Sequence, residues 1–308
     1  MALYPLRFIP LEQKKMWGKE SWQISGMEGN CSVIANGFLK GNDLNEVIEI
    51  YMDEILGSKV YDQWGVYFPL LFKFIQADDD LSLQVHPNDE QAYEAHQQLG
   101  KAEMWYVTEV KKGAFVRLGF VEETDHNEIH EVLHHGDLTQ YVNVFEAKKG
   151  DVFFIPAGLI HSLGKGTTVA EIQEASDLTY RLYDFNRVDS EGNKRELHIH
   201  EGLEVCDFRK YTNPYVQYEN KPNEPVTLMA DNHFITNKLS INKTIERDYS
   251  DIDSFVAYMC VEGSGTITAD DTEPVVIQQN ESVLIPACLE RVSISTPANA
   301  TILETYLP

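Results

Sequence analysis

Four polar side chains in the first half of the chain could meet at one site and bind a divalent metal ion. Gln84 and His86 lie two residues apart in a strand-like run, so their side chains point to the same face. Glu103 opens the next strand-like run, and His161 follows a turn further along the chain. Two imidazoles and one carboxylate leave coordination positions open, which is typical of catalytic rather than structural zinc. Because these donors also suit Fe, Mn or Ni, the residue types alone leave the metal undecided.

His161 ends a stretch whose glycines and proline predict a rigid turn beside a buried strand. Gly150 suits a tight turn because glycine adopts positive φ without a steric penalty. The run Val152–Ile155 is typical of a buried strand, and Pro156 and Gly158 end it in a turn. The layout Gly-x5-Pro-x-Gly-x2-His resembles the second signature motif of cupin barrels. A lone strand histidine is more often a packed polar residue than a ligand, but the four residues and this layout together favour the ligand.

Two cations present a choice between a structural and a functional role. Lys73 interrupts the apolar run Tyr67–Ile75, where an unpaired charge would be costly to bury. It could pair with an acidic residue or face an anionic substrate, and we favour the substrate because the run abuts the proposed metal strand. Arg181 carries the same choice, with Asp184 as a candidate partner.

Helical spacing predicts three short helices around these strands. Apolar residues recur at this spacing from Asn42 to Leu56, ahead of a C-cap at Gly57. Asn88 or Asp89 can cap a second helix. The third helix, between Thr124 and Leu138, carries four histidines that we interpret as solvated rather than as ligands, namely His126, His130, His134 and His135.

The end of the chain repeats the layout around His161. The stretch from Asn280 to Arg291 follows the order of Gly150 to His161, with Arg291 where the histidine stands. Asparagine tolerates the turn conformation at the first position. Because arginine stays protonated and cannot bind a metal, we expect a second barrel of the same kind without a metal site.

These patterns predict a mainly β protein with some α, built as two cupin-type jelly-roll β-barrels with a small helical insertion. A catalytic domain with helical insertions is expected over residues 1–230, and a C-terminal cupin-like barrel over residues 231–308. The net charge of −24 argues against nucleic acid and anionic membrane as partners, and means that an anionic substrate needs local lysines and arginines. Four scattered cysteines, no apolar leader and no membrane-length apolar run predict a reduced, cytoplasmic protein, which we expect to be a monomer or weak homodimer.

Several of these stretches together resemble one enzyme family. FPLLFKFI, LSLQVHPND, KAEMWY and AEIQEASDLTYR are similar to motifs of type I phosphomannose isomerase, in its short bacterial form. The likeness extends from the Trp17-Gly18 pair into the C-terminal barrel. Glutamine at position 84, where the general cupin pattern has histidine, leaves the fourth protein ligand open.

The resemblance implies a role for each candidate residue. It implies Zn²⁺ held by His86, Glu103 and His161, and the lack of a metal site in the repeat predicts one ion per chain. It implies Arg181 as the active-site arginine, Glu171 as a candidate acid/base, and Lys73 as a contact to the substrate.

The resemblance also implies the reaction, which interconverts mannose 6-phosphate and fructose 6-phosphate by proton transfer through an enediol. Two alternatives remain open at this point. An Fe-dependent cupin oxygenase would use the same ligand types but would not need Lys73 and Arg181 for a phosphate. A non-catalytic sugar-binding cupin would keep the barrel and rarely need an open metal site.

Overall fold

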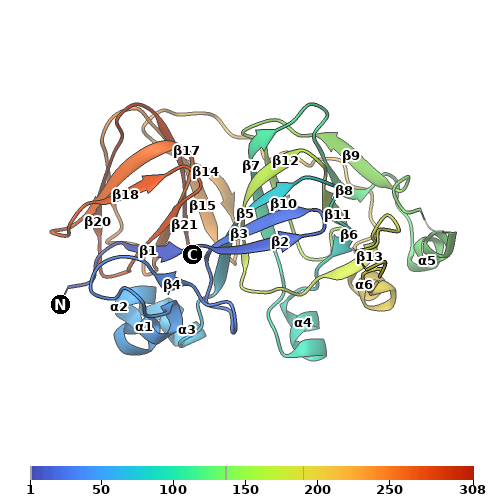
Figure 1. Ribbon diagram of the computed structural model, residues 1–308, viewed down its shortest axis with the longest axis horizontal. Helices are drawn as coiled ribbons and strands as arrows, with labels where there is room; N and C mark the ends of the chain where they lie inside the picture. The colour runs from blue at the N-terminus through green and yellow to red at the C-terminus, as the bar shows by residue number, and fades with distance from the viewer. Residues whose placement is uncertain (1, 136, 190) are drawn as a thin grey trace. The chain divides into compact units, whose positions relative to one another are not determined.

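Short, mostly antiparallel strands build most of the chain (Figure 1). The computed structural model describes residues 2–135, 137–189 and 191–308. They group into two compact units. The first contains Met1–Leu11, Ser21–Lys73 and Gln217–Pro308, and the second contains Glu12–Glu20 and Phe74–Val216.

A ten-stranded sheet dominates the first unit. Its hydrogen-bonded order runs β14-β15-β21-β17-β19-β1-β4, while β16, β18 and β20 pair off this path. The strands are β1 (Leu6–Ile9), β4 (Val33–Ile34), β14 (Pro225–Ala230), β15 (Ile235–Ile241), β16 (Ile245–Asp248), β17 (Val256–Ala269), β18 (Val275–Gln278), β19 (Ser282–Ile285), β20 (Arg291–Ser295) and β21 (Ala300–Tyr306). Side chains such as Tyr258, Ile285 and Ile302 form an apolar core against this sheet.

Three short helices belong to the same unit, namely α1 (Leu44–Tyr51), α2 (Asp53–Leu56) and α3 (Ser58–Trp64). Asp43 begins α1 with a capping box, because its carboxylate accepts from the Glu46 backbone and the Glu46 side chain accepts from the Asp43 backbone. The predicted helix is confirmed in place but is interrupted at Met52, where φ is 48°. Gly57, the predicted C-cap, follows α2 with φ of 89°.

Two sheets with a shared core account for most of the second unit, although β3 and β5 also have residues in the first. The six-stranded sheet has the order β10-β7-β12-β5-β3-β2, and the five-stranded sheet has the order β13-β6-β11-β8-β9. Trp105, Val107, Leu118 and Leu163 pack into one apolar core between them. The strands are β2 (Leu11–Lys15), β3 (Gly18–Ile24), β5 (Leu70–Ala77), β6 (Leu83–Val85), β7 (Glu103–Val110), β8 (Phe115–Phe120), β9 (Val142–Glu146), β10 (Val152–Ile155), β11 (His161–Leu163), β12 (Thr167–Glu174) and β13 (Tyr180–Tyr183).

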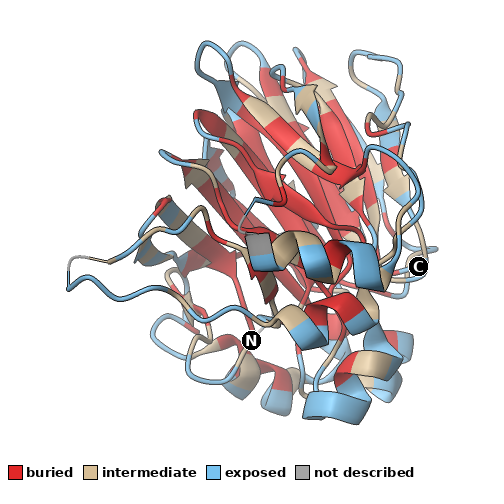
Figure 2. Cartoon of the chain, turned by 90° about the vertical axis from the view of Figure 1, so that its right-hand side faces the viewer, coloured by how far each residue is buried: buried red, intermediate tan, exposed pale blue. Residues whose placement is uncertain are grey.

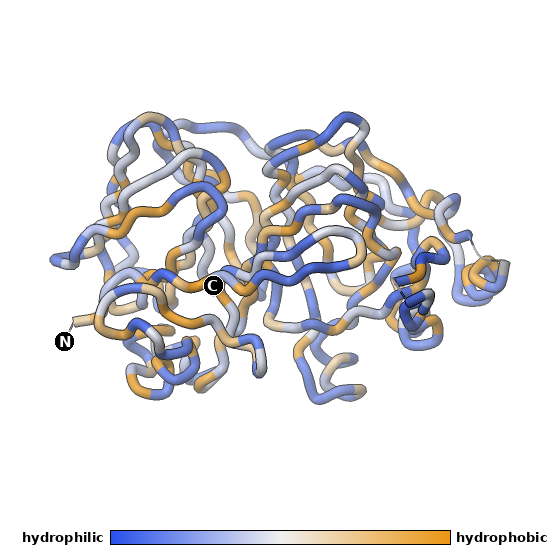
Figure 3. Tube along the Cα trace, viewed as in Figure 1, coloured by the Kyte–Doolittle hydropathy of each residue, from blue (hydrophilic) through white to orange (hydrophobic). Residues whose placement is uncertain are grey.

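Three further helices lie outside these sheets, namely α4 (Asp89–His96), α5 (His126–His135) and α6 (Ile199–Val205). Asn88 begins α4 with a second capping box, so the predicted second and third helices are both confirmed. Figure 2 shows buried residues concentrated in the strands and exposed residues on the helices and connections. Figure 3 shows the hydropathy along the same trace, with β2 as a hydrophilic run in blue.

The predicted class, mainly β with some α, is confirmed, and in the described ranges the strand pairing forms open sheets. The compact units differ from the predicted division at residues 230 and 231. The physical reason is that β1 pairs with β19, so the first strand of the chain joins the C-terminal sheet. None of the helices in the described ranges is long and apolar enough to cross a membrane.

Candidate metal and active site

Three of the predicted site residues lie in a row across the five-stranded sheet. Gln84 on β6 is opposite His161 on β11, and on its other side it is opposite Arg181 on β13. Residues directly opposite each other on antiparallel strands point to the same face. Pairing of distant strands therefore brings together side chains that lie far apart in the sequence.

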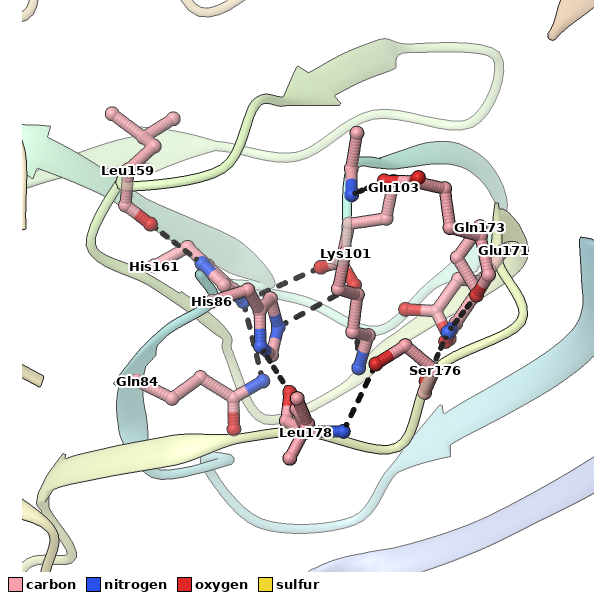
Figure 4. A network of polar contacts seen from close by, with 12 residues as sticks. Gln84, His86, Lys101, Glu103, Leu159, His161, Glu171, Gln173, Ser176 and Leu178 are labelled. Atoms are coloured by element: carbon pink, nitrogen blue, oxygen red, sulfur yellow. Dashed lines mark hydrogen bonds and ion pairs between the residues drawn. The ribbon is translucent and has the colours of Figure 1, made fainter. Parts of the chain in front are cut away.

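The predicted ligands His86, Glu103 and His161 meet in the interior of the second unit. His86 Nε2 is 3.6 Å from Glu103 Oε2, and His161 Nε2 is 3.3 Å from Glu103 Oε1. One donor atom from each residue lies within 4.8 Å of the other two. All three side chains are at most 1% exposed, and Figure 4 shows them converging, with Glu103 on β7, His161 on β11 and His86 just after β6. This spacing suits three ligands around one ion, with further positions left for substrate.

Backbone carbonyls orient both imidazoles toward that point. His86 Nδ1 lies 2.8 Å from Leu178 O, and His161 Nδ1 lies 2.8 Å from Leu159 O. Because a carbonyl only accepts, each Nδ1 carries the hydrogen, which leaves each Nε2 on the side where the three residues converge, as a metal ligand requires. Burial lowers the pKa of His161 to about 4, so its ring is neutral at pH 7. The donor set therefore fits a metal ion.

Lys101 is a site residue that the sequence analysis did not single out. Its Nζ is 3.6 Å from Glu103 Oε2, and the side chain is buried. Lysine 101 lies two residues before Glu103, which is the strand spacing that puts side chains on one face. That spacing, with a lysine next to a buried run, is the signal that could have identified it.

Glu171 lies on β12 next to the metal-ligand cluster. Its Oε1 accepts a hydrogen bond of 2.8 Å from Trp105 Nε1. The Trp105 ring in turn meets the His161 ring edge-on, with 5.6 Å between the centroids. Trp105 is buried, as predicted, but its indole also positions a carboxylate. The carboxylate is therefore held beside the cluster within the same buried region.

Arg181 is half-buried beside the same face. Its Nη1 donates a 2.8 Å hydrogen bond to the backbone carbonyl of Glu196. Burial, together with the nearby charge of Arg195, lowers the pKa of the guanidinium from its ordinary value. Within the described residues, Asp184 forms its ion pairs with Arg187 and Arg195 rather than with Arg181. The alternative of a simple Arg181–Asp184 ion pair therefore finds no support.

Lys73 is buried on β5, and its Nζ lies 5.3 Å from the centroid of the Trp22 ring. Both residues belong to the first unit, whereas His86, Glu103 and His161 belong to the second. A charge stacked on an indole is one way to hold a buried lysine. Its substrate-binding role remains a prediction.

The C-terminal repeat copies the backbone of the metal strand but not its ligands. Asn280 adopts φ of 67°, as Gly150 adopts 91°, which agrees with the predicted turn. Arg291 begins β20 as His161 begins β11, yet its side chain is exposed. Val256 lies opposite Ile285 where Glu103 lies opposite Ile155. The position of the carboxylate ligand is thus apolar in the repeat.

A buried polar network occupies the interior of the C-terminal sheet. Glu304 lies opposite Tyr258, at the place that Glu171 takes opposite Trp105 in the other unit. Arg247 donates to both oxygens of its carboxylate, from Nε at 2.8 Å and from Nη2 at 3.0 Å. Asn237 donates a further hydrogen bond of 2.9 Å, and the Tyr249 hydroxyl donates another. The carboxylate of the repeat is therefore fully engaged in internal contacts.

Comparison with known proteins finds one enzyme family whose members are similar to this chain. Residues 5–119 match the family described as the catalytic domain of type I phosphomannose isomerase. A mannose-6-phosphate isomerase of Bacillus subtilis is 36% identical over 224 residues, which cover 67% of this chain and 69% of the relative. One from Streptococcus mutans is 32% identical over 268 residues, with 87% and 82% covered.

The fold has a counterpart among solved structures. A crystal structure of the mannose 6-phosphate isomerase from Bacillus subtilis matches this chain with a TM-score of 0.86 at 27% identity. The match covers 98% of this chain and 99% of that one. It confirms the predicted cupin-type fold.

Proposed function

The chain belongs to the type I phosphomannose isomerase family of enzymes, and we propose that it interconverts mannose 6-phosphate and fructose 6-phosphate with one zinc ion per chain. The convergence of His86, Glu103 and His161 at one buried point is the observation that carries this proposal. A purely structural histidine pair would not need a carboxylate between its two Nε2 atoms. The relatives named as mannose-6-phosphate isomerases support the choice of substrate.

His86, Glu103 and His161 would hold the ion, and Gln84 lies close enough to complete or orient the set. When bound there, zinc supplies Lewis-acid polarisation of the sugar carbonyl and stabilises negative charge on its oxygens. The protein side chains bind the substrate and transfer its protons. Burial of the cluster excludes water and strengthens each electrostatic contact.

Glu171 is our candidate for moving the proton between C1 and C2 of the sugar. The Trp105 indole binds one of its oxygens, which holds the carboxylate in one orientation. A carboxylate held in this way can accept a C–H proton and return it to the neighbouring carbon.

Lys101 carries a positive charge beside Glu103 and can donate a hydrogen bond, so we assign it to the oxygen atoms of the enediol. In this assignment Glu171 transfers the proton that is bound to carbon, and Lys101 acts at the oxygen atoms, between which the other proton moves.

Arg181 and Lys73 would bind the negatively charged groups of the substrate and its enediolate. The chain carries a net charge of −24, so a sugar phosphate needs local cations to bind. The guanidinium of Arg181 can contact two oxygens at once and is assigned to the enediolate. Lys73 is assigned to binding of the sugar phosphate. The four free cysteines agree with a cytoplasmic location, which we include in the proposal.

The test is a coupled assay of purified protein with mannose 6-phosphate, run beside unphosphorylated mannose and with an oxygen electrode. We expect conversion of the phosphorylated sugar alone and no uptake of oxygen. Oxygen uptake with bound iron would instead support a cupin oxygenase. Saturable binding of the sugar phosphate without turnover would indicate a non-catalytic sugar-binding protein.

A further inference from the structure

Helix α5 carries a row of histidines outside the active site. His126, His130 and His134 follow one another at intervals of four residues, which places them on one face of the helix. The proposed isomerisation uses none of them. Figure 1 shows α5 outside the two sheets of its unit. The side chain of His135, which follows them, lies outside the described residues.

Packing holds the helix that presents these rings. Ile129 is fully buried, and Val132 and Leu133 pack against the same apolar cluster. The row of histidines lies beside this apolar face, with His130 half-buried and His134 exposed. Little backbone order would have to be gained for the two rings to act together.

The imidazoles are close enough to share one ion. The ring centroids of His130 and His134 are 4.5 Å apart, and those of His126 and His130 are 6.2 Å apart. His126 Nε2 also lies 3.7 Å from Glu204 Oε1 on α6. Two imidazoles one helical turn apart are a recognised way to bind zinc-like ions. The His126 imidazole and its Glu204 partner extend the donor row toward the start of the helix.

The segment from His130 to His134 also has the pattern His-Glu-x-x-His, which on a helix is typical of zinc peptidases. A peptidase needs a third protein ligand and a substrate cleft. In the part of the chain that the structure describes, two groups of three ligating side chains lie together, and neither includes His130. Glu131 is exposed on the helix surface. The motif therefore has the chemistry of a surface chelate rather than that of a peptidase centre.

The sequence pattern favoured solvated histidines here, but the contact between the two rings leads us to the opposite inference: we propose that His130 and His134 bind a second, exchangeable transition-metal ion on the surface of α5. Imidazole donors favour Cu²⁺, Ni²⁺ and Zn²⁺ over Mg²⁺ or Ca²⁺. With two protein ligands and solvent in the other positions, the ion binds more weakly than the ion in the buried cluster. The site is independent of the isomerase reaction, and occupying it leaves turnover unchanged.

The test uses Ni²⁺ as the probe and protein whose buried site is already loaded with zinc. Calorimetric titration should detect one additional site per chain in the wild type. His134→Ala should weaken Ni²⁺ binding at least about tenfold, since loss of even an outer partner of a metal site costs about 10–100-fold in affinity. Glu131→Gln is the matched control on the neighbouring face of the helix and should bind Ni²⁺ like the wild type.

Amide hydrogen exchange distinguishes chelation of Ni²⁺ by both histidines from loose association of Ni²⁺ with the helix. Bridging one turn should slow amide hydrogen exchange within α5 in the presence of Ni²⁺, and His134→Ala should abolish this slowing. All three proteins should keep the same isomerase activity, which shows that they are folded. Absence of an additional Ni²⁺ site, or unchanged Ni²⁺ affinity in His134→Ala, would overturn the proposal. Equal losses in Glu131→Gln and His134→Ala would overturn the assignment to the two histidines.

Discussion

Gln84 lies opposite His161 across β6 and β11, and its side-chain Nε2 is 3.2 Å from the Nε2 of the imidazole. The ring hydrogen is on Nδ1, since that atom contacts Leu159 O, so Nε2 is the acceptor in this contact. A glutamine here, where the general cupin pattern has histidine, can orient the ring or offer an amide oxygen to the metal. The amide end lies at the point where the proposed ligands converge.

Gln84→Ala should weaken zinc binding about 10–100-fold without unfolding the protein, because it removes a partner of a ligand rather than a ligand of the trio. Competition with a chromophoric chelator measures the affinity. Gln84→His, which restores a nitrogen donor, should recover most of it. Zinc affinity equal to that of the wild type in Gln84→Ala would mean that the amide has no part in the site.

Arg181→Lys should lower kcat about 100-fold while the zinc content stays at one ion per chain. Lysine keeps the charge but loses the planar set of donors, and loss of one donor to a developing oxyanion costs about 100- to 1,000-fold. Steady-state kinetics and elemental analysis on the same preparation separate the two effects. If the variant turns over at the wild-type rate, Arg181 is a structural residue.

The two buried lysines predict different kinetic changes. Lys73→Met should mainly raise KM for mannose 6-phosphate, because a phosphate contact is made equally in the ground state and the transition state.

Lys101→Met should mainly lower kcat, because its charge lies beside Glu103, where negative charge develops on the substrate. An unchanged KM in Lys73→Met would favour a structural role for Lys73, and an unchanged kcat in Lys101→Met would remove Lys101 from the chemistry.

Glu304→Gln tests whether the C-terminal sheet has a structural role only. Removing one partner of a buried ion pair costs about 3–5 kcal/mol, so the free energy of unfolding should fall by an amount of that order. Zinc content and kcat should not change at a temperature where the variant is folded. Urea denaturation measures the free energy of unfolding. A loss of metal with the fold intact would show that this network contributes to a metal site.

Local sequence patterns predicted the elements that carry the ligands, because turns, buried runs and strand spacing are local properties. His86 directly follows β6, which was expected from composition, whereas β11, which His161 begins, was expected only as the end of a turn. Lys101 was missed because it precedes the strand-like run that Glu103 opens. The break at Met52 could not be predicted, since helical spacing continues through it.

Long-range pairing accounts for the remaining differences. The joining of β1 to β19 links residues far apart in the chain, and no local pattern specifies it. The outward direction of Arg291 follows from the alternation along β20, in which Val292 and Ile294 face the core. A shift of one residue in a strand turns each side chain to the other face. Aligning the two repeated stretches of this chain therefore matched Arg291 to His161, but it did not reveal that the Arg291 side chain points to solvent.

Stepwise addition of Zn²⁺ to the metal-free protein tests the central claim most directly, with isomerase activity on mannose 6-phosphate followed at each step. Activity should be absent at the start, rise in proportion to added zinc and stop rising at one ion per chain. His161→Ala should stay inactive at every step while keeping the wild-type far-ultraviolet circular dichroism spectrum. Full activity in demonstrably metal-free protein, or a zinc-dependent rise of equal size in His161→Ala, would contradict the account.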